Sequence, residues 1–314
     1  MPVQVVRGRR PGPCLFVSAA LHGDEINGVE IIRRLLNVNA LRRLRGSLIA
    51  VPVVNVYGFI GHSRYLPDRR DLNRSFPGSE RGSMAARLAN LFLTEIVAKA
   101  DYGIDLHTAA IHRDNLPQVR ANLNDAGTER LASAFHAPVI INSGLVDGSL
   151  RQAASRLGVP VLVYEAGEAL RFDELAIRAG VRGILSVMRE LAMLPPGRVR
   201  KHVVEPFVAR ASGWLRAPQS GILRAVTHLG ARVERGQLLG VVSDPFGEVE
   251  EPVQARYDGI VIGRTNLPLV NEGEALFHVA RFRRPDEVVD TLESFQQEFD
   301  PNLDILPPEE PPLV

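Results

Sequence analysis

The amino-acid sequence predicts a three-layer α/β sandwich followed by a small all-β domain. From residue 14 to about 195, short apolar runs alternate with amphipathic helical patterns. This alternation is typical of a mostly parallel or mixed sheet that is covered by helices on both faces. Beyond about residue 200, short apolar runs are instead separated by glycine turns, which indicates consecutive β-strands.

The elements of the first part follow in order along the chain. Strands are expected where apolar residues run without interruption, and helices where they recur every three or four positions. The expected strands are 14–20, 46–55, 102–108, 137–143 and 160–167, and the expected helices are 27–37, 83–100, 149–158 and 172–194. We expect ligands to bind where the carboxyl ends of the strands meet at one edge of the sheet.

The second part contains an internal repeat. Residues 221–242 and 259–280 share a Gly-Ile start, a Val before a charged glycine turn and a closing apolar strand. Such paired units resemble the barrel-sandwich domains of biotinyl and lipoyl carriers, but the stretch between the halves lacks the lysine that a carrier modifies. We therefore interpret residues 199–282 as a lid or structural cap. The Pro- and Glu-rich tail, 283–314, is expected to pack loosely or be disordered.

Composition excludes several classes of function. The 37 basic and 36 acidic residues nearly balance, so there is no electrostatic footprint for nucleic acid or an anionic membrane. The single cysteine, Cys14, excludes an intramolecular disulfide framework and a cysteine-based zinc finger. No apolar run approaches the ~20 residues that span a bilayer. We expect a soluble, cytoplasmic protein in which any metal has His and carboxylate ligands.

Two histidines and a glutamate are candidate metal ligands. His22 and Glu25 follow the first strand and lie three residues apart, so both can face one ion. Taken alone, this pair is more often a helix start whose acidic residues, Asp24 and Glu25, favour the positive end of the helix dipole. His107 ends a later strand, and Asp105 precedes it as a carboxylate that could hold its ring. Two His and one Glu with an open fourth position are typical of a catalytic zinc site.

Other histidines are weaker candidates. His112 is the alternative to His107, but it is expected on the following loop. The remaining histidines, which we interpret as structural or surface residues, are His62, His136, His202, His228 and His278.

A long charged segment, 61–78, follows the second strand and is too long for a simple connector. Its polar side chains could hold carboxylates or a developing oxyanion near the same sheet edge. The alternative is a solvated charged loop. The residues concerned are Arg64, Arg69, Arg70, Asn73 and Arg74.

Glu165 emerges from an almost wholly apolar strand, 160–167. Apolar neighbours would raise the pKa of this carboxyl group towards a value suited to a general base. Glu168, three residues later, is the alternative.

Together these motifs resemble the succinylglutamate desuccinylase and aspartoacylase family, a branch of the zinc carboxypeptidase-like hydrolases. The resemblance rests on H-G-D-E at 22–25, R-Y…D-L-N-R at 64–74, D-L-H-T at 105–108 and Y-E-A-G at 164–167. Each motif is weak alone, but their order is specific. The resemblance covers residues 14 to about 195 and extends to the β domain, since members of this family carry one.

The resemblance implies a catalytic domain, 1–198, with one Zn²⁺ per chain. By motif, the zinc ligands would be His22, Glu25 and His107, Arg64 would polarise the scissile carbonyl, Asn73 and Arg74 would bind a substrate carboxylate, and Glu165 would be the general base. The expected reaction is hydrolysis of the amide bond of a small anionic N-acyl amino acid by a zinc-bound water.

Three alternatives use the same residues: a metallocarboxypeptidase, an esterase and a non-catalytic binding protein. No partner other than the small substrate is expected, neither nucleic acid nor membrane, and self-association into a homo-oligomer is left open. For a contribution of the β domain to the substrate site, the sequence offers only a guess, Tyr257.

Overall fold

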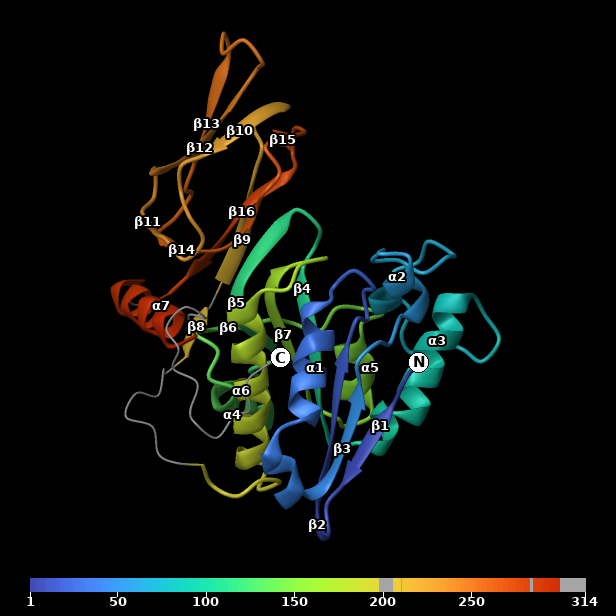
Figure 1. Cartoon of the computed structure of the whole chain (residues 1–314). Coiled ribbons are helices and arrows are strands. Elements are labelled where there is room, and N and C mark those ends of the chain that lie inside the picture. The colour runs from blue at the N-terminus through green and yellow to red at the C-terminus, as the bar shows by residue number, and fades with distance from the viewer. Residues whose placement is uncertain (198–205, 210, 283–284, 300–314) are drawn as a thin grey trace.

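A computed structural model of the protein places the described residues in one twelve-stranded mixed sheet and a separate four-stranded sheet. The described residues are 1–197, 206–209, 211–282 and 285–299. Helices cover the large sheet on both faces where it belongs to the first part of the chain, and the β strands of the C-terminal part extend from one end (Figure 1). The predicted α/β fold with a C-terminal β part is confirmed.

The centre of the large sheet is parallel. Its order is β1-β3-β2-β4-β7-β5, in which β3, β2, β4 and β7 run parallel, β1 is antiparallel to β3, and β5 is antiparallel to β7. β6 pairs with β5, and β8 with β6. The strands are β1 (Gln4–Arg7), β2 (Arg10–Ala19), β3 (Arg45–Val51), β4 (Tyr102–Ala109), β5 (Arg113–Ala121), β6 (Val139–Asn142), β7 (Val161–Glu168) and β8 (Phe207–Ala209).

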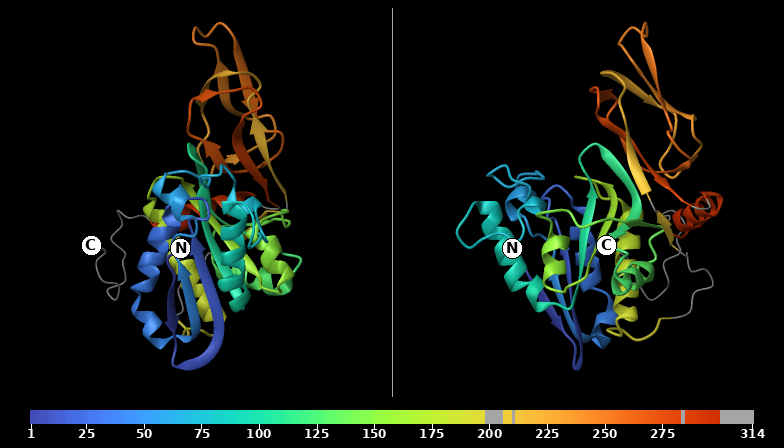
Figure 2. Two further views of the ribbon diagram at one scale, coloured as in Figure 1. Left: turned by 90° about the vertical axis from the view of Figure 1, so that its right-hand side faces the viewer. Right: turned by 180° about the vertical axis from the view of Figure 1, so that it is seen from behind.

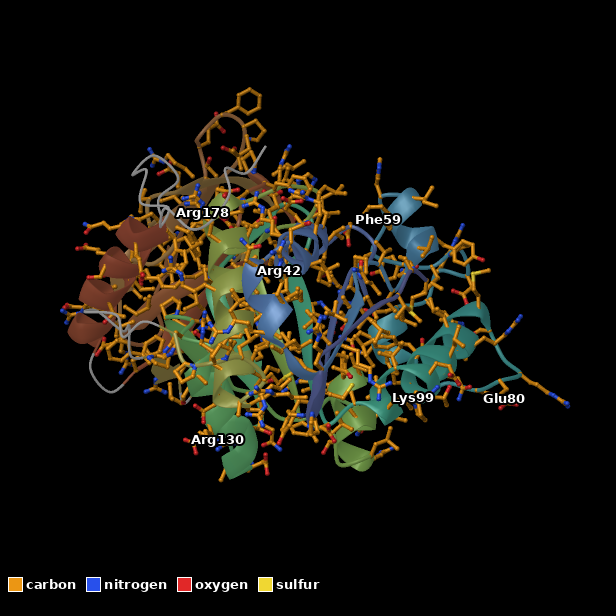
Figure 3. The ribbon with its side chains drawn as sticks, turned by 60° about the horizontal axis from the view of Figure 1, so that its bottom comes forward. Arg42, Phe59, Glu80, Lys99, Arg130 and Arg178 are labelled. Carbon is orange, nitrogen blue, oxygen red and sulfur yellow. The ribbon has the colours of Figure 1, made fainter. Side chains whose placement is uncertain are left out.

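Two apolar cores lie on opposite faces of this sheet. Alternate side chains of β2, β4 and β7 point to opposite faces, so α1, α4 and α6 cover one core and α3 and α5 the other (Figure 2). Charged side chains stay outside the cores: Lys99 and Arg130, both labelled in Figure 3, are more than half exposed. The helices are α1 (Asn27–Leu36), η1 (Asn39–Arg43), α2 (Val56–Ile60), η2 (Leu72–Arg74), α3 (Met84–Glu95), η3 (Val97–Lys99), α4 (Ala126–Ala134), α5 (Leu150–Arg156), α6 (Glu174–Glu190) and α7 (Pro285–Phe299).

Among the elements that were not predicted from the sequence, β5 and α4 are the ones that matter most for the sheet beside β7. β5 carries charged and amide side chains and contains Pro117, which normally argues against an inner strand. Proline is tolerated here because the pairing of β5 with β7 shifts register between Asn115 and Gln118. Asp125 begins α4 by accepting a hydrogen bond from the N–H of Thr128.

The C-terminal β domain, residues 211–281, continues the large sheet. β14 pairs with β5, β16 with β14 and β9 with β16, whereas β10, β12, β13 and β15 form the four-stranded sheet. The internal repeat is visible in this arrangement, because the short β11 of the first unit pairs with β14 of the second, and β15 of the second pairs with β10 of the first. The strands are β9 (Ala211–Arg216), β10 (Gly221–Ala225), β11 (Arg232–Val233), β12 (Leu238–Ser243), β13 (Glu250–Gln254), β14 (Gly259–Thr265), β15 (Leu269–Val270) and β16 (Ala275–Arg281).

The prediction that the C-terminal tail packs loosely or is disordered is partly wrong. Residues 285–299 form α7, whose Phe295 and Phe299 are buried in the core beside α6. The rest of the tail, 300–314, and the expected boundaries near 198 and 283 lie outside the described residues. None of the described helices combines the length and apolar character that a membrane crossing requires. The cytoplasmic location stays a prediction.

Candidate active site

The candidate site lies at the carboxyl ends of β2, β4 and β7. Ala20, directly after β2, adopts a left-handed conformation (φ 48°), which turns the chain before His22. Gly23 then packs so closely against α2 that a Cβ atom would lie 2.0 Å from the backbone of Gly58. This tight turn directs His22 and Glu25 inward, and both side chains are buried.

His22, Glu25 and His107 bring three candidate ligand atoms within 4.8 Å of one another. Glu25 Oε1 lies 2.7 Å from His22 Nδ1, and Glu25 Oε2 lies 2.7 Å from His107 Nδ1. A helix does start directly after this segment, since α1 begins at Asn27, but it has no side-chain cap, and Glu25 contacts the two imidazoles instead. Two imidazole nitrogens that converge on one buried carboxylate are a donor set that fits a divalent metal ion.

The charges of these three residues depend on one another. Burial alone would raise the pKa of Glu25, but the imidazoles of His22 and His107 outweigh burial and lower it well below its usual range. Burial opposes charging of both histidines, yet nearby carboxylates raise the pKa of His22 and raise that of His107 well above its usual value. Protons and a metal ion would therefore compete for the same imidazole nitrogens.

Carboxylates hold the outer nitrogens of both imidazoles. Asp105 Oδ2 lies 2.6 Å from His107 Nε2, and Asp105 Oδ1 accepts a 2.7 Å hydrogen bond from Ser18 Oγ. Asp71 Oδ1 lies 3.2 Å from His22 Nε2. The sequence indicated Asp105 but missed Asp71, although Asp71 lies within the D-L-N-R motif. Such carboxylates fix the ring orientation and the tautomer of metal-binding histidines.

All seven residues predicted for the site line one pocket of about 280 Å³. They are His22, Glu25, Arg64, Asn73, Arg74, His107 and Glu165. The two alternatives lie elsewhere: the side chain of His112 is exposed, and Glu168 accepts hydrogen bonds from His112 N–H and Asn266 Nδ2 outside this lining.

The charged segment at 61–78 divides between the pocket and solvent. Arg64 donates to Glu25 Oε1 and Asp71 Oδ2, both at 3.1 Å, and thereby ties the segment to the triad. Asn73 Oδ1 accepts a hydrogen bond from Leu150 N–H. Arg69 and Arg70, in contrast, do not line the pocket.

The sequence suggested that apolar groups shield the carboxylate of Glu165, but its neighbours in the structure are polar. Its Oε2 lies 3.0 Å from Arg120 Nε and accepts a 3.1 Å hydrogen bond from Asn115 Nδ2. Both partners belong to β5, the strand that the sequence analysis missed. On the other side of β7, Glu165 is paired in register with His107 of β4. The carboxylate thus lies between the triad and a polar strand, and Oε1 makes no hydrogen bond with the described residues.

Further pocket residues were missed because their segments gave no motif. Arg113, Asn115 and Arg120 come from β5, Arg151 comes from α5, and Trp214 comes from the β domain. Tyr257, the residue guessed from the sequence, instead donates long hydrogen bonds to backbone oxygens within the β domain.

Comparison with known proteins identifies related chains. Residues 11–191, more than half of the chain, match the family described as the succinylglutamate desuccinylase/aspartoacylase catalytic domain. The N-alpha-acetyl-L-2,4-diaminobutyric acid deacetylase of Halomonas elongata is 28% identical over 307 residues, which cover 93% of this chain and 87% of that protein.

Solved structures agree in fold. The succinylglutamate desuccinylase/aspartoacylase of Rhodobacter sphaeroides superposes with a TM-score of 0.81 at 26% identity, covering 90% of this chain and 89% of that chain. The product-bound ectoine utilization protein EutE (DoeB) of Ruegeria pomeroyi also has a TM-score of 0.81, at 25% identity, covering 89% and 88%. Together with the order of the motifs and their convergence in one pocket, these matches show that the chain belongs to the succinylglutamate desuccinylase/aspartoacylase family.

Proposed function

We propose that this protein is a zinc-dependent deacylase that hydrolyses the amide bond of a small N-acyl amino acid. The observation that carries the proposal is the convergence of the buried His22, Glu25 and His107 with Glu165 in one small pocket. Membership of the family and the named deacetylase relative support amide hydrolysis as the reaction.

His22, Glu25 and His107 would hold the zinc ion. When bound, zinc supplies Lewis-acid chemistry, because it acidifies water and polarises a carbonyl group. Asp105 and Asp71 keep the two imidazoles oriented, with their Nδ1 atoms facing Glu25. These contacts hold the three candidate ligand side chains in place.

Glu165 acts as the general base. It lies on β7 beside His107 of β4, and neighbouring strands are about 4.8 Å apart. Arg120 and Asn115 engage Oε2, so Oε1 accepts the proton of the attacking water and later returns it to the departing amine. Loss of this group typically costs about 10²–10⁴ in rate.

Arg64, Asn73 and Arg74 position the substrate. Arg64 contacts Glu25 and lines the pocket, so we assign it to the carbonyl oxygen, where charge develops during attack. Asn73 and Arg74 bind the carboxylate of the amino acid, and Arg74 is oriented by a 2.6 Å hydrogen bond to its neighbour's carbonyl oxygen. A pocket of about 280 Å³ favours small substrates over the carboxyl ends of long peptides.

The test combines metal analysis with release of free amine. The purified protein is expected to contain about one zinc per chain and to release amine from N-acetyl or N-succinyl amino acids. N-acetyl-2,4-diaminobutyrate is the first substrate to test, with dipeptides and acyl esters as comparisons. Glu165→Gln should retain zinc but lose at least a hundredfold in kcat, with KM nearly unchanged. Retained turnover in a metal-free His107→Ala variant would refute the zinc mechanism.

A further inference from the structure

Trp214, the only tryptophan of the chain, belongs to the β domain but lines the pocket of the catalytic domain. It lies on β9 and is half-buried. Among the described residues of the pocket lining, it is the one that the β domain supplies. The role of the β domain at the site therefore depends on what Trp214 contacts.

The continuous sheet brings Trp214 close to β5. Arg113 pairs in register with Thr265 of β14, Gly263 of β14 pairs with His278 of β16, and His278 pairs with Trp214 of β9. Side chains at paired positions lie on the same face of a sheet. Asn115 of β5, which lies on the same face as Arg113, pairs with Gly263, and since Gly263 has no side chain, β14 places no side chain between Asn115 and His278 in this row.

Two side chains support the indole ring. The imidazole of His278 stacks almost parallel to it, with centroids 4.7 Å apart and planes at 12°. The guanidinium carbon of Arg113 lies 5.4 Å from the centroid of the indole, a distance at which a cation is attracted to the ring. His278 is buried, and burial together with the charge of Arg120 lowers its pKa to about 3. The stacking partner is therefore a neutral ring.

The positive charge of Arg113 is not neutralised by a carboxylate in the described part of the protein. Arg113 lines the pocket, and no carboxylate of the described residues forms an ion pair with it. Arg120, on the same strand, is already paired with Glu165. A planar guanidinium is suited to bind a carboxylate through two parallel hydrogen bonds. Its long side chain, however, loses conformational freedom when it does so, and the contact with a fixed indole reduces this cost.

We propose that Trp214 is a positioning residue that holds the guanidinium of Arg113 at the pocket wall, where Arg113 binds a second carboxylate of the substrate, beyond the one assigned to Asn73 and Arg74. The inference rests on the proposed deacylase function of the same pocket. Through this contact the β domain takes part in substrate binding without providing a group to the reaction itself.

Binding of succinate tests the proposal without any reaction, since succinate is a carboxylate ligand that has no amide bond. Because Trp214 is the only tryptophan, its fluorescence reports directly on this wall. Wild-type protein is expected to change its emission as succinate binds, whereas neutral succinamide should cause no change. Arg113→Met should remove the response. If the fluorescence emission of the wild-type protein does not change when succinate is added, the proposal is refuted.

Calorimetric titration with succinate then measures the coupling between the two residues. Trp214→Leu and Arg113→Met should each weaken binding about tenfold, and the double variant should bind no more weakly than Arg113→Met alone. Trp214→Phe keeps a ring and should lose about threefold or less. Additive losses in the double variant, or unchanged affinity in a folded Trp214→Leu, contradict the proposal.

The matched control is Tyr257→Leu. Arg281 lies 5.0 Å from the ring of Tyr257, so this pair has the same chemistry in the same domain but lies outside the pocket lining. Succinate affinity should be unchanged in Tyr257→Leu, and an equal loss there would assign the effect to the stability of the β domain. A succinate response in a protein that releases no amine refutes only the proposed deacylase function. Amine release with no contribution from Trp214 refutes only this inference.

Discussion

Removing the carboxylate behind His107 should weaken metal binding in a graded way. Asp105 is 1% exposed and contacts His107 Nε2 at 2.6 Å and Ser18 Oγ at 2.7 Å. In Asp105→Ala the imidazole N–H is left buried without its acceptor. In Asp105→Asn the amide oxygen can still accept from His107, because the Ser18 hydroxyl can turn and accept from the amide nitrogen. The two variants therefore separate loss of charge from loss of the hydrogen bond.

The magnitude follows from these contacts. Loss of a partner behind a metal-binding histidine typically costs about 10–100-fold in metal affinity, or about 1.4–2.7 kcal/mol. We expect Asp105→Ala near the upper limit and Asp105→Asn near the lower limit. Ser18→Ala, which retains the carboxylate at His107, is the control and should change affinity by about threefold at most.

Competition for Zn²⁺ with a fluorescent chelator measures these affinities, and thermal melting checks that each variant is folded. A folded Asp105→Ala variant with the zinc affinity of the wild type would refute the reasoning. So would an Asp105→Asn variant as weak as Asp105→Ala, because the hydrogen bond would then contribute nothing beyond the charge.

Two further predictions concern protons and the β domain. Because the pKa values of His22 and His107 are raised, metal binding must displace protons, so zinc affinity should rise with pH through the neutral range. Calorimetry in buffers of different ionisation enthalpy measures this proton release, and no release at neutral pH would contradict the prediction. Gly263→Ala places a Cβ atom 2.6 Å from Asn115 Oδ1, which should displace the Asn115 side chain from Glu165. Since a hydrogen bond to a charged group contributes about 1.5–3 kcal/mol, kcat should fall by roughly tenfold, and unchanged kinetics would show that Asn115 is not needed.

The triad could be predicted because each of its parts has a local signal. His22 and Glu25 follow one apolar strand, and His107 lies at the end of another. Parallel strands bring their carboxyl ends to one edge of a sheet, so the three residues were expected together without knowledge of the strand order. The structure then makes β2 and β4 direct neighbours. The choice of His107 over His112 likewise followed from the strand end.

The surroundings of Glu165 could not be predicted, for a physical reason. A strand that forms a pocket wall carries polar side chains on that face, so it lacks the apolar run by which buried strands are found. β5 is such a strand: Asn115 and Arg120 face the pocket, and Pro117 adds a signal against a strand. With β5 missed, Glu165 appeared to have only apolar neighbours. Its real partners are an arginine and an amide.

The β domain presents the same difficulty over a longer range. As a separate lid it could influence the pocket only by closing over it, and no local motif would mark the residue that reaches inside. The structure instead joins β14 to β5 by backbone pairing, so the position of Trp214 is set by strand register across β14, β16 and β9. Substituting Trp214 or Gly263 therefore alters the wall of the pocket from within a continuous sheet. This explains why His278, interpreted from the sequence as merely structural, contacts the one aromatic residue that the β domain adds to the site.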